Sequence, residues 1–181
     1  MILAPEIRGT VPIRSAPAAF LQAFRQRVVA GLLSTKPSAR SNYVITQAND
    51  DRLHVRASDW STAINVGLNE LDLQLGQQHT VSYKVRYWRW ATYVLGLSGV
   101  LGLTGLVLLH TLDVRSYITR SPQRMLRGLS VDQNLFVAWG LVLFGGFVWP
   151  WILIVLHKPA LRRLTIRLIT EVDAQGTLPP S

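Results

Sequence analysis

The sequence predicts an α+β membrane protein, with an N-terminal helix, an antiparallel β-meander, a two-helix transmembrane hairpin and a C-terminal amphipathic helix. Residues 90–112 and 133–157 are apolar stretches without Asp, Glu, Lys or Arg. Each reaches the ~20 residues that a helix needs to cross ~30 Å of hydrocarbon. Residues 52–57 and 81–87 alternate apolar with polar side chains, as half-buried strands do. Residues 20–32 repeat apolar positions every four residues, which indicates an amphipathic helix.

The N-terminal module is expected to begin with an extended arm over residues 1–16, where proline and glycine interrupt any regular pattern. Ser15 followed by Pro17 is typical of a helix start. The helix should bury one apolar stripe, formed by Phe20, Phe24, Val28 and Leu32. A loop over residues 36–41 should follow, and residues 17–88 together should form a membrane-proximal α+β module.

The β-meander is predicted from two-residue periodicity and from the turn residues between its segments. Strands are expected at residues 43–47, 52–57, 63–68, 71–75 and 81–87. Asn49–Asp51 and Gly76–Gln78 are typical hairpin turns. A sheet of this size needs cover on its apolar face, and the stripe of the N-terminal helix is the expected cover.

Two transmembrane helices are expected at residues 89–112 and 134–157, joined by a short connecting loop over residues 113–133. Pro150 lacks an N–H and should kink the second helix near its end. Pro159 should then open a separate basic amphipathic helix over residues 158–174, before a tail over residues 175–181. We expect that helix either to lie among lipid headgroups or to dock on the sheet.

Charge and aromatic residues indicate an orientation for the hairpin. The net charge is +9, and the basic residues lie beside the apolar stretches, which favours anionic lipid headgroups over nucleic acid as the partner. Those expected to face lipid are Arg86, Arg89, Lys158, Arg162, Arg163 and Arg167. The expected membrane-interface anchors are Trp88, Trp90, Tyr93, Trp139, Trp149 and Trp151.

The basic residues beside the N-terminal module and the C-terminal helix outnumber those of the connecting loop, so both termini are predicted to be cytoplasmic. No signal peptide is recognisable in residues 1–10, because they lack an apolar core. The predicted location is the bacterial inner membrane, with two passes.

His110 and His157 are the only candidate ligands for a haem or pigment in the apolar stretches. They end antiparallel helices, so they should lie ~30 Å apart and could not share one haem. One histidine alone could hold a pigment, but interfacial hydration is the simpler interpretation. No cofactor and no metal are therefore predicted.

Small residues form a stripe along the first apolar stretch and recur in the second. They are Gly96, Ser98, Gly99, Gly102 and Gly105, with Gly145 and Gly146. Small residues let helix backbones approach closely in lipid. The stripe could serve packing within the hairpin or docking of another protein.

The soluble module has no nucleophile motif, phosphate-binding glycine loop or metal-ligand spacing. An enzyme is not predicted. The first hypothesis is a non-catalytic accessory or scaffolding subunit of a larger inner-membrane assembly, such as a respiratory or photosynthetic complex, with other integral membrane subunits as partners. The alternatives are a membrane-anchored lipid- or signal-sensing module, and a pigment or haem carrier.

Overall fold

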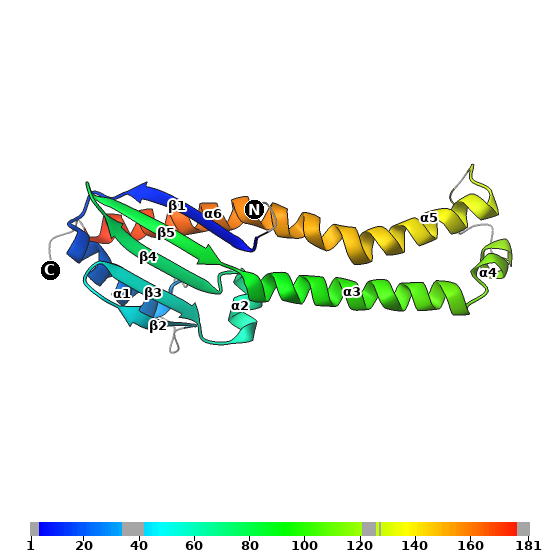
Figure 1. The fold of residues 1–181 in the computed structure, drawn as a ribbon, viewed down its shortest axis with the longest axis horizontal. Coiled ribbons are helices and arrows are strands. Elements are labelled where there is room, and N and C mark those ends of the chain that lie inside the picture. Colours follow the sequence, from blue (N-terminus) through cyan, green and yellow to red (C-terminus); the bar gives the residue numbers. More distant parts are fainter. Residues whose placement is uncertain (1–3, 34–41, 121–125, 127, 177–181) are drawn as a thin grey trace. The chain divides into compact units, whose positions relative to one another are not determined.

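The computed structural model describes residues 4–33, 42–120, 126 and 128–176. The chain forms two compact units. The first, here called the sheet unit, comprises Met1–Ala91 and Leu156–Ser181; the second, the hairpin unit, comprises Thr92–Val155. The fold is a mixed α+β fold with one five-stranded antiparallel sheet and two apolar helical segments (Figure 1).

The sheet has the strand order β1-β5-β4-β3-β2, and every neighbouring pair is antiparallel. Its strands are β1 (Glu6–Pro12), β2 (Tyr43–Ala48), β3 (Arg52–Ala57), β4 (Glu70–Gly76) and β5 (Thr80–Arg86). Strands β2 to β5 form the predicted meander, with turns after Ala48 and Gly76. The period-two pattern located these four strands because each buries one face only.

The expected N-terminal arm is instead edge strand β1, which pairs with β5 from Glu6 opposite Arg86 to Pro12 opposite Thr80. In the four-strand meander alone, β5 would be an edge with unpaired backbone groups, and β1 pairs with them. Gly9 is required in β1 because the Tyr83 side chain crosses it. A Cβ atom at this position would lie 2.5 Å from the Tyr83 hydroxyl oxygen.

The strand expected at residues 63–68 is wrong, because this segment forms helix α2 (Trp60–Val66) and its exit. The Asp59 carboxylate accepts a hydrogen bond from the Thr62 N–H, at 2.7 Å, and so caps the helix N-terminus. Gly67, at φ +77°, ends the helix in the left-handed conformation that glycine adopts without strain. The caps at Asp59 and Gly67 favour a helix here more strongly than the short alternation of apolar residues favours a strand.

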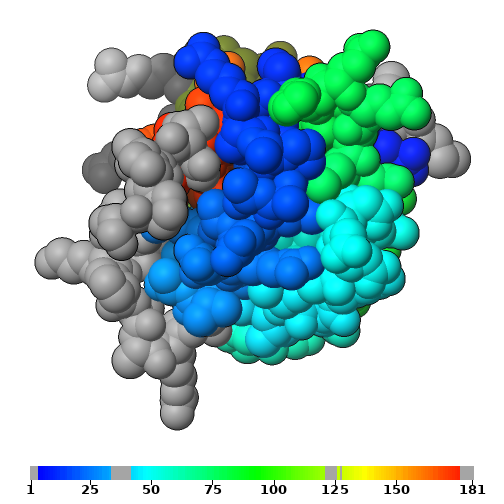
Figure 2. Space-filling view, turned by 90° about the vertical axis from the view of Figure 1, so that its left-hand side faces the viewer, coloured from blue at the N-terminus to red at the C-terminus, as the bar shows by residue number. Residues whose placement is uncertain are grey.

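Two helices cover the same face of the sheet (Figure 1). Helix α1 (Pro17–Gly31) begins with a proline in its first turn and buries Phe20, Phe24 and Val28, as predicted. Its surface lies beside the β2–β3 hairpin in the end-on view of Figure 2. Ser15 does not cap α1, whose N-cap residue is Ala16.

The C-terminal part of helix α6 (Trp149–Gly176) is the second covering helix. From Leu156 onward it belongs to the sheet unit, and it buries Leu161, Leu168, Ile169 and Val172. Of the two locations expected for residues 158–174, docking on the sheet is therefore the one that the structure shows. The end of the expected tail beyond Gly176 lies outside the described residues, as does the expected loop over residues 36–41.

Asp173 joins α6 to the junction between β1 and α1. Its carboxylate accepts hydrogen bonds from the Ser15 N–H (2.9 Å), the Ser15 hydroxyl (2.6 Å) and the Arg14 N–H (2.9 Å). Burial of Asp173 would raise the pKa of its carboxyl group, but the hydrogen bonds from Ser15 and Arg14 outweigh it, so the pKa is below its usual value. This contact explains why Ser15 is buried although it caps no helix.

The hairpin unit contains the rest of the two long helical segments. Helix α3 (Trp88–Thr111) is followed by the short helix α4 (Val114–Arg120), which lies in the expected connecting loop. Helix α5 (Val131–Leu143) begins at a capping box of Ser130 and Gln133.

The second helical segment does not break where the sequence predicted. Helix α5, the π-helical segment η2 (Phe144–Val148) and α6 follow one another without a gap, and Pro159 lies inside α6 rather than at a new start. The apolar contacts of α6 on the sheet outweigh the hydrogen bond that Pro159 removes. At Pro150, the irregularity takes the form of the wider π-helical turn just before it, where the Trp149 N–H bonds to the Phe144 carbonyl.

Helix α3 and the continuous segment Val131–Gln175 are long and apolar enough to cross a membrane. In their most apolar windows, only 6% and 17% of the residues are buried inside the protein. A core helix of a water-soluble protein would be mostly buried, so these proportions distinguish the two segments from core helices.

Candidate membrane-entry cluster and helix-packing faces

The two long helices of the hairpin unit touch through glycine. A Cβ atom added at Gly102 would lie 2.8 Å from the Gly146 Cα, and one added at Gly146 would lie 2.5 Å from the Gly102 Cα. The Cβ atom added at Gly146 would also lie 3.4 Å from the Ser98 carbonyl oxygen. Any side chain at either glycine would separate the backbones, so this is a small-residue crossing of the kind found between membrane helices.

Gly105 extends the same contact, because a Cβ atom there would lie 2.9 Å from a Val142 methyl group. The predicted small-residue stripe thus contributes Ser98, Gly102, Gly105 and Gly146 to packing within the hairpin. Of the two roles considered for the stripe, packing within the hairpin is the one that these four residues have.

The remaining small residues lie on faces that this chain leaves open. Apart from its own stretch of helix, no atom of the described residues lies within 4 Å of the Cβ position at Gly96, Gly99, Gly140 or Gly145. Large apolar side chains surround these faces and are exposed, among them Val100 (61%), Leu103 (57%) and Leu141 (66%). The glycines therefore form two sets, one that is used within the hairpin and one that is not.

His157 packs among aromatic rings at the end of the sheet unit where α3 begins. Its imidazole stacks on Trp90 with a centroid separation of 4.0 Å and an interplanar angle of 13°. Tyr87 contacts it edge-on, at 5.4 Å. The Nε2 atom lies against Gly67, is buried, and has no hydrogen-bond partner among the described residues. The contacts of His157 are thus those of a packing residue, and a metal ion bound at Nε2 would have to displace Gly67.

His110, by contrast, is exposed near the end of α3 in the hairpin unit. Within the described residues, no group of three or more His, Cys, Asp or Glu side chains could hold a metal ion. The two histidines that the sequence singled out therefore have different surroundings, and no described contact brings them together.

Arg89 lies in a second aromatic cluster at the start of α3. Its guanidinium carbon is 5.6 Å from the Trp60 ring centroid and 5.5 Å from the Trp88 ring centroid. The two tryptophans meet edge to face at 6.1 Å. Arg89 is only 8% exposed, whereas Trp60 and Trp88 are 50% and 41% exposed.

The backbone of this cluster is held by a buried amide. The Arg89 N–H donates to the Asn69 Oδ1 at 2.7 Å, and the Asn69 Nδ2 donates to the Ala63 carbonyl at 3.1 Å. Asn69 thereby connects α2, β4 and the first turn of α3. Trp60 and Asn69 were not among the residues predicted from the sequence, because both lie far from the apolar stretches, although an isolated tryptophan in a polar segment was a signal.

Two of the six basic residues predicted to contact lipid are already paired within the sheet unit. Arg86 contacts Glu70 at 3.0 Å, and Arg167 contacts Glu171 at 2.7 Å. Arg162 and Arg163 are exposed on α6. On the sheet face away from the helices, Arg52 pairs with Asp72 at 2.6 Å, and this guanidinium holds the pKa of the Asp72 carboxyl group below its usual value. Because Glu70 and Asp72 neutralise Arg86 and Arg52, the sheet does not present a continuous basic surface.

The other predicted interface aromatics are half-exposed or exposed. Tyr93, Trp149 and Trp151 are between 42% and 44% exposed, and Trp139 is half-buried. Trp90 differs from these, because its ring stacks on His157. Lys158, the residue after His157, is half-buried.

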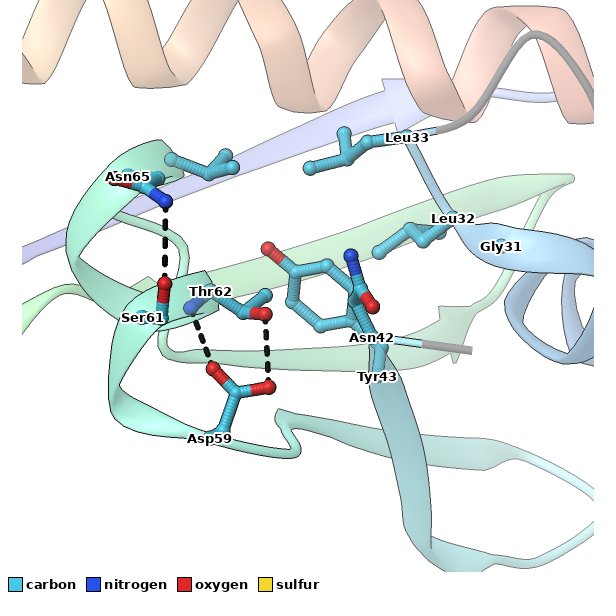
Figure 3. Close-up of a pocket in the computed structure, with 10 residues that line it drawn as sticks. Gly31, Leu32, Leu33, Asn42, Tyr43, Asp59, Ser61, Thr62 and Asn65 are labelled. Carbon is cyan, nitrogen blue, oxygen red and sulfur yellow. Dashed lines mark hydrogen bonds between the residues drawn. The ribbon is translucent and has the colours of Figure 1, made fainter. Parts of the chain in front are cut away.

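A cavity of about 570 Å³ opens beside α2 in the sheet unit (Figure 3). The Tyr43 ring projects between Leu32 and Thr62, and Asn42 and Asn65 add polar groups to the wall (Figure 3). The Asp59 carboxylate in this wall is bound to the Thr62 N–H and to the hydroxyls of Ser58 and Thr62. Asp59 is therefore engaged in capping α2, and it does not point to acid–base chemistry.

Comparison with known proteins gives no match to this chain among protein-family models, curated proteins or solved structures.

Proposed function

We propose that this protein is a non-catalytic accessory or scaffolding subunit of a larger inner-membrane assembly, anchored by the hairpin unit. The observation that carries the proposal is the division of the small residues. Gly102, Gly105 and Gly146 serve the crossing within the hairpin, while Gly96, Gly99 and Gly145 leave open space at the helix surface. In lipid, such open glycine faces favour close approach of a further helix.

The sheet unit supports the proposal through its connectivity. It contains both the N-terminal strands and the C-terminal part of α6, joined by Asp173. If the two apolar segments cross the bilayer, the sheet unit must therefore stay on one side and α4 on the other. The basic residues beside the sheet unit favour the cytoplasm for that side.

Gentle detergent extraction of the full chain tests the proposal. The wild-type protein should elute with other integral membrane chains, in a particle well above the 20.3 kDa of one copy. Gly99→Leu should reduce this association at least tenfold, because a leucine fills the open face. Val100→Leu is the matched control, since Val100 is already a large, exposed side chain.

Two results would contradict the proposal. One is a wild-type protein that extracts as a monodisperse monomer, and the other is a particle made only of copies of this chain. Retained secondary structure in Gly99→Leu, measured by circular dichroism, confirms that the variant affects docking rather than folding.

A further inference from the structure

The Arg89 side chain is largely buried, and its guanidinium has no carboxylate partner among the described residues. Its residue is only 8% exposed, and the described residues supply it with two tryptophan faces but no carboxylate and no hydrogen-bond acceptor. A guanidinium carries five N–H donors, and the faces of two rings satisfy none of them along its edge. Buried arginines are normally paired for this reason.

Two other arginines of the sheet unit, Arg86 and Arg52, each have a carboxylate partner. Arg86, three residues earlier, contacts Glu70 at 3.0 Å although its side chain is 50% exposed. Arg52 is bound by both oxygens of Asp72, at 2.9 and 2.6 Å. Of these three arginines, Arg89 is the most buried and has no carboxylate partner among the described residues, which points to an anion supplied from outside the chain.

The position of Arg89 indicates the source of that anion. It is the second residue of α3, the apolar helix that is long enough to cross a membrane. Trp60 and Trp88, which flank its guanidinium, are half-exposed, and tryptophan concentrates at the level of lipid headgroups. An arginine held at this level faces phosphate oxygens, which its planar edge can bind in pairs.

We propose that Arg89, held between Trp60 and Trp88, binds the phosphate of an anionic phospholipid headgroup. Trp60 and Trp88 meet edge to face and form an aromatic corner beside the guanidinium, and the hydrogen bond from the Arg89 N–H to Asn69 fixes its backbone. The two rings occupy part of the surroundings of the guanidinium, and its N–H groups remain for the phosphate. The site requires α3 to enter the bilayer, as the proposed function does, but it does not require a protein partner.

The test uses the full chain purified in mild detergent, titrated with phosphatidylglycerol or phosphatidylcholine and followed by native mass spectrometry and thermal unfolding. Phosphatidylglycerol should bind at least tenfold more tightly than phosphatidylcholine and should raise the unfolding temperature. Arg89→Gln should weaken phosphatidylglycerol binding about 10- to 100-fold, because a charge-assisted bidentate contact is lost. Arg89→Lys should recover only part of the affinity, since an ammonium cannot form the planar pair.

Arg86→Gln is the matched control, because its guanidinium is already paired with Glu70, and its lipid affinity should stay within twofold of wild type. Equal binding of the two lipids by the wild-type protein would overturn the proposal, and this result does not depend on any variant folding. Displacement of the lipid by millimolar inorganic phosphate would also overturn it, as it would indicate a site for free phosphate. Loss of partner subunits from Arg89→Gln without any lipid preference would assign the site to a protein carboxylate instead.

Discussion

Replacing Asp173 tests whether the C-terminal helix is an integral part of the sheet unit. The carboxylate accepts two backbone N–H groups and one hydroxyl, all between 2.6 and 3.1 Å, and the residue is only 7% exposed. Hydrogen bonds to a charged group contribute ~1.5–3 kcal/mol each, and orphaned buried donors add a similar cost. Because water can reach part of the vacated space, we expect Asp173→Ala to lower the free energy of unfolding by about 3 kcal/mol.

Thermal unfolding in detergent, followed by near-ultraviolet circular dichroism, measures this effect. For a chain of this length a loss of about 3 kcal/mol corresponds to a decrease in Tm of roughly 6–12 °C. Asp173→Asn should lose about half as much, because the amide oxygen can still accept from Ser15. Glu171→Gln is the control on the same helix, since the exposed Arg167–Glu171 pair contributes only ~0.3–0.5 kcal/mol. An Asp173→Ala variant as stable as Glu171→Gln would refute the docking of α6 through Asp173.

Further predictions concern the packing glycines and acid stability. Gly67→Ala should destabilise the sheet unit by about 2 kcal/mol or more, because Gly67 has φ +77° and its Cβ would collide with His157; the double variant with His157→Ala should regain part of the loss in the same Tm assay. Gly146→Leu should separate the two helices of the hairpin, whereas Gly145→Leu should not; cysteines placed at Gly105 and Val142, whose Cβ positions lie 3.6 Å apart, should cross-link less in the first variant only. The depressed pKa of Asp173 means that its deprotonated form stabilises the fold above pH ~4 and that this contribution is lost as the pH falls through the lower folded-state pKa, so the acid decrease in Tm should be smaller in Asp173→Ala.

The meander strands and the two apolar segments could be predicted from the sequence because each has a strong local signal. Leu53, Val55 and Ala57 alternate with polar neighbours on β3, and all three are buried. Residues 90–112 likewise lack ionised side chains, and all but the last of them lie in the apolar helix α3. In both cases the signal lies within a single element, as an alternation of apolar and polar residues in β3 and as an unbroken apolar run in α3.

What the sequence could not reveal depends on contacts between distant residues. Edge strand β1 is defined by its pairing with β5, 68 to 80 positions further along the chain. Ser15 appeared to be a helix cap, but its hydroxyl binds Asp173, at the other end of the chain. Pro159 appeared to begin a helix, but packing on the sheet holds α6 continuous through it.

The residues of the candidate site also divide into those with a local sequence signal and those defined by contacts between distant residues. Trp88 and Arg89 were predicted from their place beside the first apolar stretch, as residues at the membrane interface. Their partner Trp60 was not identified, because residues 63–68 were expected to form a strand and Trp60 lay outside the predicted elements. The separation of the glycine stripe into Gly102 and Gly99 faces also required the position of the second helix, which periodicity alone does not give.

Accessibility labelling of single cysteines tests membrane crossing most directly, because the natural chain has no cysteine. Thr119→Cys in α4 and Ser82→Cys in β5 are both exposed positions. With a membrane-impermeant maleimide on intact cells, Thr119→Cys should react at once, and Ser82→Cys should react only after the membrane is permeabilised. Equal labelling of both positions before permeabilisation, or protection of both until then, would contradict a hairpin that crosses the bilayer twice.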